Sequence, residues 1–148
     1  MKIVQSALQF RGYRVNKAQF DLTGELNDYK GKVELAPVFR RAIHTLSENR
    51  HLLLLGVQIG DIDGDTSLPF YINVEIEGDF ALSENDQADI LMKQNAVAIL
   101  FPYLRSTLTM LTTVANINPI ILPTINLAKM FESEQTQESD DGDEDGNS

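Results

Sequence analysis

Residues 99–111 read ILFPYLRSTLTML, a long apolar stretch with a single charge at Arg105. Apolar residues from Leu91 to Leu111 recur at three-, four- and seven-residue steps, the spacing that places side chains along one side of a helix. Pro102 lies inside this run, and a proline removes one backbone donor and clashes with the carbonyl four residues earlier. We therefore expect a buried helix that Pro102 kinks or splits. We expect no membrane span, because no run of about 20 apolar residues exists.

The sequence before this helix is rich in strand-forming residues and alternates with a period of two, as half-buried strands do. The period slips near Gly12, which predicts a bulge in the first strand. Asp63-Gly64, between the third and fourth segments, is a strong hairpin signal, and Ser83 with Asp86 predicts the helix start. The four segments are LQFRGYRVNKAQFDL (8–22), KVELAPVFRRAIHTL (32–46), RHLLLLGVQIGDI (50–62) and TSLPFYINVEIEGDF (66–80).

The fourth segment has an apolar and a polar face. Its predicted apolar face is Phe70, Ile72, Val74 and Ile76, and its predicted polar face is Tyr71, Asn73, Glu75 and Glu77. A short last helix, INLAKMFESEQ (125–135), is expected after two prolines, with Asn126 as its N-cap. The sequence therefore predicts an α+β domain. It is a four-stranded antiparallel sheet with the long kinked helix and a short C-terminal helix packed on one face.

The chain has 148 residues, enough for one domain with a proper core, and its net charge is −10. Eight acids and no base lie from Glu132 to the end, so the rest of the chain carries −2. We therefore expect a folded domain over 1–132 and a disordered acidic tail over 133–148. Such a tail either keeps the protein soluble or binds a basic partner. Nucleic acid is not an expected partner, because it requires clustered lysines and arginines.

Catalytic and metal-binding patterns are absent from the sequence, so we expect neither an enzyme nor a cofactor or metal. The chain has no cysteine, no glycine-rich phosphate loop and no serine nucleophile motif. Asp61, Asp63 and Asp65 alternate like calcium ligands, but the twelfth position of that loop would be Ile72 instead of a glutamate. The absence of cysteine and of a secretory signal fits the cytoplasm, where we expect this protein.

The apolar segments FYINVEI, NPIILPTINL and AKMF exceed what a small sheet is expected to bury. They can be core and subunit interface, or they can line a groove that takes an extended, unfolded chain. The sequence leaves both interpretations open.

Several of these segments resemble the SecB family of protein-export chaperones. ILFPYLRSTLTML resembles the helix signature NILFPYARE of that family, and LPTINLAKMF resembles its LAPVNFDALF segment at the same spacing. LQFRGYRVNKAQFDL resembles its first strand, and NVEIEGDFAL resembles its fourth strand running into the helix. The resemblance covers about residues 8–131 in the same order.

The resemblance implies a cytoplasmic, ATP-independent holdase that binds unfolded polypeptides in a long apolar groove. It also implies a homotetramer, a dimer of dimers, whose long helices meet at the subunit interface. The implied interface residues are Leu100, Tyr103, Leu104 and Leu108. The implied groove residues are Phe20, Val38, Phe39, Ile121, Leu122, Ile125, Leu127, Met130 and Phe131.

The family also docks its translocation motor, SecA, on an acidic sheet face, and here the resemblance is incomplete. The corresponding residues are Asp21, Tyr71, Asn73, Glu75 and Glu77. Lys17 and Asn73 stand where the family pattern has acids. SecB-like proteins also serve as dedicated chaperones of antitoxins. The sequence therefore predicts a holdase for protein export, with a dedicated partner chaperone as the alternative.

Overall fold

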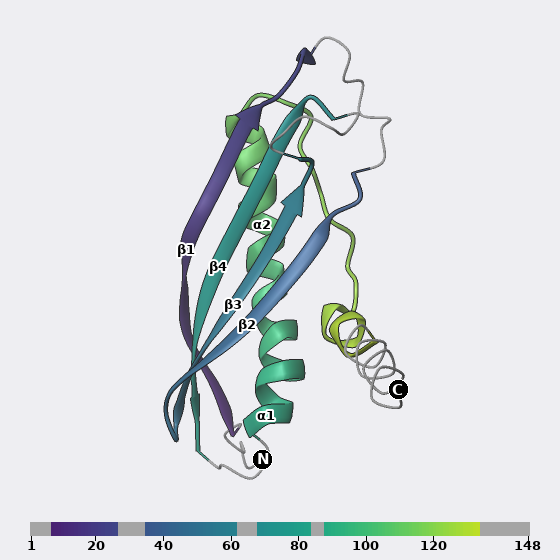
Figure 1. Ribbon diagram of the computed structural model, residues 1–148. Coiled ribbons are helices and arrows are strands. Elements are labelled where there is room, and N and C mark those ends of the chain that lie inside the picture. The colour runs from purple at the N-terminus through teal and green to yellow at the C-terminus, as the bar shows by residue number, and fades with distance from the viewer. Residues whose placement is uncertain (1–6, 27–34, 62–67, 84–87, 134–148) are drawn as a thin grey trace, which may run out of the picture.

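Figure 1 shows the computed structural model of the chain, which describes residues 7–26, 35–61, 68–83 and 88–133. Its sheet consists of β1 (Leu8–Leu22), β2 (Val38–Ser47), β3 (Arg50–Ile59) and β4 (Phe70–Leu82). All neighbouring strands are antiparallel and their order is β1-β4-β3-β2, so β1 and β2 form the two edges. The predicted α+β fold with its four-stranded antiparallel sheet is confirmed.

Strand β1 is bent by two irregularities in its pairing with β4. One shift of register lies between Phe10 and Gly12, and the other lies between Val15 and Lys17. Gly12 has a φ of +128°, a conformation that residues with a Cβ rarely adopt. The bulge predicted near Gly12 is therefore confirmed, whereas the second irregularity was not predicted.

One face of the sheet is covered by the long helix and forms the core. Alternate residues of β4 point to this covered face, and the apolar face predicted for this strand is confirmed. Phe70, Ile72, Val74 and Ile76 are each 0% exposed. Burying a side chain of this size typically stabilises a fold by about 1.5–3 kcal/mol. The opposite face, called the outer face below, carries the polar residues of β4.

The long helix consists of α1 (Ala88–Ile90), a π-helical segment η2 (Leu91–Ala96) and α2 (Val97–Val114), and it runs along the covered face (Figure 1). Helix α2 continues through Pro102, so a split at this residue is excluded. Leu100 and Leu104, on either side of Pro102, are 0% exposed, and their burial outweighs one missing hydrogen bond. Gly78 of β4 allows the helix to pack close to the sheet. A Cβ at this position would lie 3.1 Å from the methyl carbons of Leu100.

Helix α2 ends in a tight reversal of the chain. Asn116 has a φ of +62°, a left-handed conformation that asparagine tolerates better than most residues. The amide of Ile117 donates to the carbonyl of Thr112 at 3.2 Å, and the amide of Asn116 donates to the carbonyl of Thr113 at 3.1 Å. These two bonds form a Schellman motif, which turns the chain back along α2.

The chain after this reversal, residues 117–126, forms an extended strap that side chains of α2 hold in place. Nε of Arg105 donates to the carbonyl of Leu122 at 2.8 Å. Oγ1 of Thr109 donates to the carbonyl of Ile120 at 2.8 Å, and the Ile120 amide donates to a threonine hydroxyl one turn further along α2. Arg105 and the threonines of α2 therefore satisfy backbone groups of the strap, which pairs with no strand among the described residues.

A C-terminal helix over residues 127–133 follows the strap and lies beside β2 and the first half of the long helix (Figure 1). The Lys129 amide donates to Oδ1 of Asn126 at 3.0 Å, which confirms the predicted N-cap.

Several predictions fall outside the described residues. These are the turn at Asp63-Gly64, the helix start at Asp86, two of the three alternating aspartates and almost all of the acidic tail. Within the described residues, one helical run, Ala88–Val114, is long and apolar enough to cross a membrane by length and composition. A core helix passes the same test, and 33% of the apolar window of this helix is buried inside the fold.

Candidate peptide-binding site

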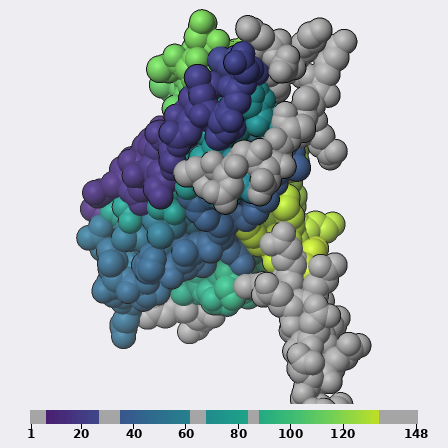
Figure 2. Space-filling view, turned by 45° about the horizontal axis from the view of Figure 1, so that its top comes forward, coloured from purple at the N-terminus to yellow at the C-terminus, as the bar shows by residue number. Residues whose placement is uncertain are grey.

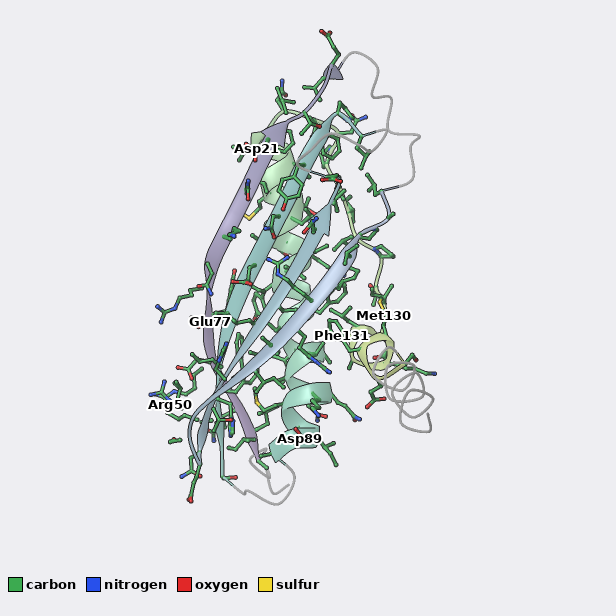
Figure 3. The ribbon with its side chains drawn as sticks, viewed as in Figure 1. Asp21, Arg50, Glu77, Asp89, Met130 and Phe131 are labelled. Atoms are coloured by element: carbon green, nitrogen blue, oxygen red, sulfur yellow. The ribbon has the colours of Figure 1, made fainter. Side chains whose placement is uncertain are left out.

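The C-terminal helix packs on the molecule through a few apolar side chains. Leu127 is 2% exposed, Phe131 is 6% exposed, and Met130 is half-buried. Figure 3 shows Met130 and Phe131 on this helix beside the sheet edge formed by β2. The helix thus lies next to an edge strand, a place where an extended peptide could also add to the molecule.

Arg41 of β2 joins the three elements that meet at this edge. Its Nη1 donates to the carbonyl of Lys93 in η2 at 3.0 Å, and its Cζ lies 4.7 Å from the ring centroid of Phe131. Burial lowers the pKa of the Arg41 guanidinium below its ordinary value, while the nearby charges of Glu132 and Asp89 oppose this effect. A second polar contact joins the amide of Gln94 to the carboxylate of Glu132.

The structure gives the predicted groove residues very different exposures. Leu122, Leu127 and Phe131 are buried in the core, whereas Val38 and Ile121 are 65% and 71% exposed. The other four, Phe20, Phe39, Ile125 and Met130, are half-buried and pack against the core. Phe39 makes an edge-on contact with Phe101 of α2 at 6.2 Å between ring centroids. The residues therefore form a packed apolar surface that the C-terminal helix partly covers, and they do not form the two walls of an open groove.

An open hollow of about 530 Å³ lies on the other side of the C-terminal helix, between it and the long helix. Its lining combines polar side chains, such as Asn95 and Asn126, with the small residues Ala98 and Ala128. Sequence reasoning did not find this hollow, because it depends on how the strap places the C-terminal helix. Among the described residues, no group of three or more histidine, aspartate or glutamate side chains could hold a metal ion.

The outer face of the sheet carries the residues expected to dock the motor, and its central acids are paired with bases. Figure 2 turns the outer face toward the viewer, and the C-terminal helix, in yellow, lies beside the blue strands. Arg14 lies 3.3 Å from the carboxylate of Glu77, and Arg40 lies 3.5 Å from that of Glu75. Lys17 stands opposite Glu75 in the pairing of β1 with β4.

The remaining docking residues are separated from those pairs or covered. Asp21 lies near one end of the sheet, far from Glu77 (Figure 3). Tyr71 is 7% exposed, and Oδ1 of Asn73 is buried without a hydrogen-bond partner among the described residues. The outer face is thus a row of balanced charges and not an acidic patch.

Arg40 reaches the carboxylate of Glu75 by crossing β3 at Gly56. A Cβ on Gly56 would lie 2.5 Å from the guanidinium carbon of Arg40, so the guanidinium occupies the space of the missing side chain. Arg50 of β3 pairs with Asp79 of the neighbouring strand β4, at 2.6 Å.

Three of the predicted interface residues, Leu100, Leu104 and Leu108, are 0% exposed and pack on the sheet of their own chain. The fourth, Tyr103, is 37% exposed and contacts Tyr13 of β1, with 4.6 Å between ring centroids and the ring planes tilted by 37°. The outward side of α2 instead carries a stripe of exposed apolar residues. The stripe consists of Ile99, Tyr103, Met110 and Val114.

The topology of the sheet, with a long helix on its covered face and a short helix at its edge, is that of a SecB-like chaperone. The chain superposes with a TM-score of 0.63 on Mycobacterium tuberculosis Rv1957, a SecB-like chaperone in complex with a ChAD peptide from the Rv1956 HigA1 antitoxin. The two chains are 15% identical, over 80% of this chain and 91% of that one.

The sequence comparison leads to the same family. The profile described as preprotein translocase subunit SecB matches residues 32–138, and the chain therefore belongs to the SecB family. It is also 33% identical over 129 residues to the uncharacterized protein MJ0357 of Methanocaldococcus jannaschii, which covers 84% of this chain and 83% of that relative. The predicted family membership is confirmed.

Proposed function

We propose that this protein is an ATP-independent holdase, without catalytic activity, that binds unfolded polypeptide segments in the cytoplasm. The observation that carries the proposal is the apolar surface at the β2 edge. The C-terminal helix covers side chains there that an extended client could also contact. Burial of apolar client side chains on such a surface contributes about 25 cal/mol per Å² to the free energy of binding, and it requires no particular sequence in the client. The complex of Rv1957 with an antitoxin peptide supports peptide binding by this fold.

The proposed assembly is a homotetramer built as a dimer of dimers. The exposed apolar stripe on α2 supports it, because Met110 and Val114 are 67% and 84% exposed in the single chain. A second copy would remove this surface from water.

Two client classes follow from the proposal. The first is preproteins held for Sec-dependent export, with SecA as a partner. The second is one dedicated client, such as an antitoxin. The charge pairs of Glu75 and Glu77 favour the second class, because a basic docking partner would have to compete with Arg40 and Arg14 for these carboxylates.

The test is aggregation of an unrelated, chemically unfolded protein, followed by light scattering in the presence of the full chain. Mass measurement of the free protein, whose chain is 16.5 kDa, reports the assembly in the same sample. Suppression at a near-stoichiometric ratio is expected for a general holdase. Protection of one antitoxin, without effect on unrelated proteins, would support the dedicated chaperone. Protection of neither would contradict the proposed function.

Two exposed or half-exposed apolar residues give a matched pair of variants. Met130→Asp introduces a charge at the C-terminal helix and should weaken suppression. Leu46→Asp introduces the same charge at a residue that is 56% exposed at the far end of β2, and it should suppress aggregation as the unmodified chain does. Equal activity of both variants would mean that clients bind elsewhere.

A further inference from the structure

We propose that the guanidinium of Arg41 is a subsite for an aromatic side chain of the bound polypeptide, and that Phe131 occupies this subsite in the free protein. The inference rests on the proposed function and adds the class of side chain that the site selects. The C-terminal helix then acts as an internal substitute for the client.

The first observation is the fixed position of the cation. Nη1 of Arg41 donates to the Lys93 carbonyl at 3.0 Å, which anchors the guanidinium from the side of η2. Its carbon lies 4.7 Å from the ring centroid of Phe131, inside the distance at which a cation and an aromatic face attract each other. An aromatic ring already fits against this cation.

The second observation is the row of side chains beside Arg41. Phe39, Arg41 and Ile43 alternate along β2, so all three point to the covered side of this edge strand. Each of them is half-buried. The row thus presents an aromatic, a cationic and an aliphatic position, spaced as the alternate side chains of an extended peptide are.

The third observation concerns how the C-terminal helix is attached to the rest of the molecule. The strap is hydrogen-bonded to α2 at Ile120, Leu122 and Thr124, where Nη1 of Arg105 lies 3.3 Å from the threonine hydroxyl. Over the described residues 127–133, the buried apolar side chains of the C-terminal helix are Leu127, Ala128 and Phe131. A hinge between the last strap bond and the helix cap would lift this helix without disturbing the strap.

The chemistry of the site selects aromatic over aliphatic side chains. A guanidinium under an aromatic face loses water but gains a favourable electrostatic contact with the ring. Under an aliphatic side chain it loses the same water and gains no such contact. A client segment with a phenylalanine or tyrosine can therefore take the place of Phe131, and a purely aliphatic segment gains less.

The experiment measures binding of a short, fluorescently labelled extended peptide to the full chain by anisotropy. The peptide carries either phenylalanine or pentafluorophenylalanine at one position. The two rings are similar in size, but fluorination reverses the charge distribution of the ring face. The unmodified protein should bind the phenylalanine peptide more tightly by about two- to fivefold. Equal affinity would overturn the proposal, even without any protein variant.

Protein variants then assign the effect to one residue. Arg41→Met should reduce the preference to about one, since methionine keeps most of the aliphatic stem but lacks the guanidinium and its charge. Arg40→Met is the matched control, because Arg40 is the next residue on β2 and points to the outer face. Phe131→Ala should tighten binding of the phenylalanine peptide by vacating the subsite.

The outcomes separate the two proposals. Binding of both peptides with equal affinity, or a preference that survives Arg41→Met, refutes the subsite and leaves the holdase function standing. Failure of the full chain to bind either peptide, together with no suppression of aggregation, refutes both.

Discussion

Replacing Arg105 with methionine tests how the strap is held. Arg105 donates from Nε to the Leu122 carbonyl at 2.8 Å and from Nη1 to the Thr124 hydroxyl at 3.3 Å. Methionine keeps most of the aliphatic stem but can make neither bond. We therefore expect the strap to loosen and the C-terminal helix, which follows it in the chain, to become easier to displace.

The expected loss of stability follows from the better of the two bonds. A hydrogen bond from a charged donor contributes about 1.5–3 kcal/mol, whereas the bond to the exposed hydroxyl of Thr124 adds little. The free energy of unfolding should therefore fall by about 1.5–3 kcal/mol. For a domain of this size, a loss of that magnitude lowers Tm by about 3–10 °C.

The assay is thermal unfolding at one fixed protein concentration, because association of subunits would otherwise change Tm. Arg14→Met is the control, since the side chain of Arg14 is 78% exposed and its ion pair with Glu77 should contribute less than about 1 kcal/mol. Hydrogen exchange should also become faster at the Ile120 amide in the Arg105 variant. Equal Tm values for the two variants would refute the role of Arg105 as a tether.

Three other substitutions have expected effects of different size. Gly78→Ala should cost about 1–3 kcal/mol in thermal unfolding, because its Cβ would lie 2.8 Å from the Phe80 ring and 3.1 Å from the methyl carbons of Leu100, whereas Gly24→Ala, with a nearest distance of 3.4 Å, should be close to neutral. A similar Tm for both would contradict the close packing around Gly78. Asn126→Ala should weaken the C-terminal helix by about 1 kcal/mol, seen as faster amide exchange there and not in the sheet. Arg40→Met should lower stability in urea by less than about 1 kcal/mol, and high salt should remove any difference that comes from the pair with Glu75.

The sequence predicted the parts of the fold that depend on local patterns. Alternation located all four strands, and the apolar period located the long helix, because each pattern records which side of an element is buried. The cap at Asn126 and the bulge near Gly12 were also predicted, since both depend on the chemistry of one or two residues.

The rest of the fold depends on partners that are distant in the sequence. No local signal pairs Arg105 with Leu122 across the turn after α2, or brings Arg41 of β2 against Phe131. The effect of Pro102 was uncertain for the same reason, because the contacts that carry α2 through it come from the sheet.

The candidate site shows this difference clearly. The resemblance supplied apolar residues such as Met130 and Phe131, but it did not supply Arg41, whose role depends on its position between three elements. It also implied acids on the outer face. It did not reveal that Arg14 and Arg40 lie beside two of them.

Gly56 has an effect on electrostatics that its own chemistry does not suggest. The guanidinium of Arg40 reaches Glu75 because it lies in the space where a side chain at position 56 would stand. Any larger residue at this position would push the arginine toward solvent and leave the carboxylate of Glu75 without this partner. A neutral substitution would thus make the middle of the outer face more negative. In this protein an uncharged residue therefore controls how acidic the outer face is, and that acidity can change without gain or loss of a charged residue.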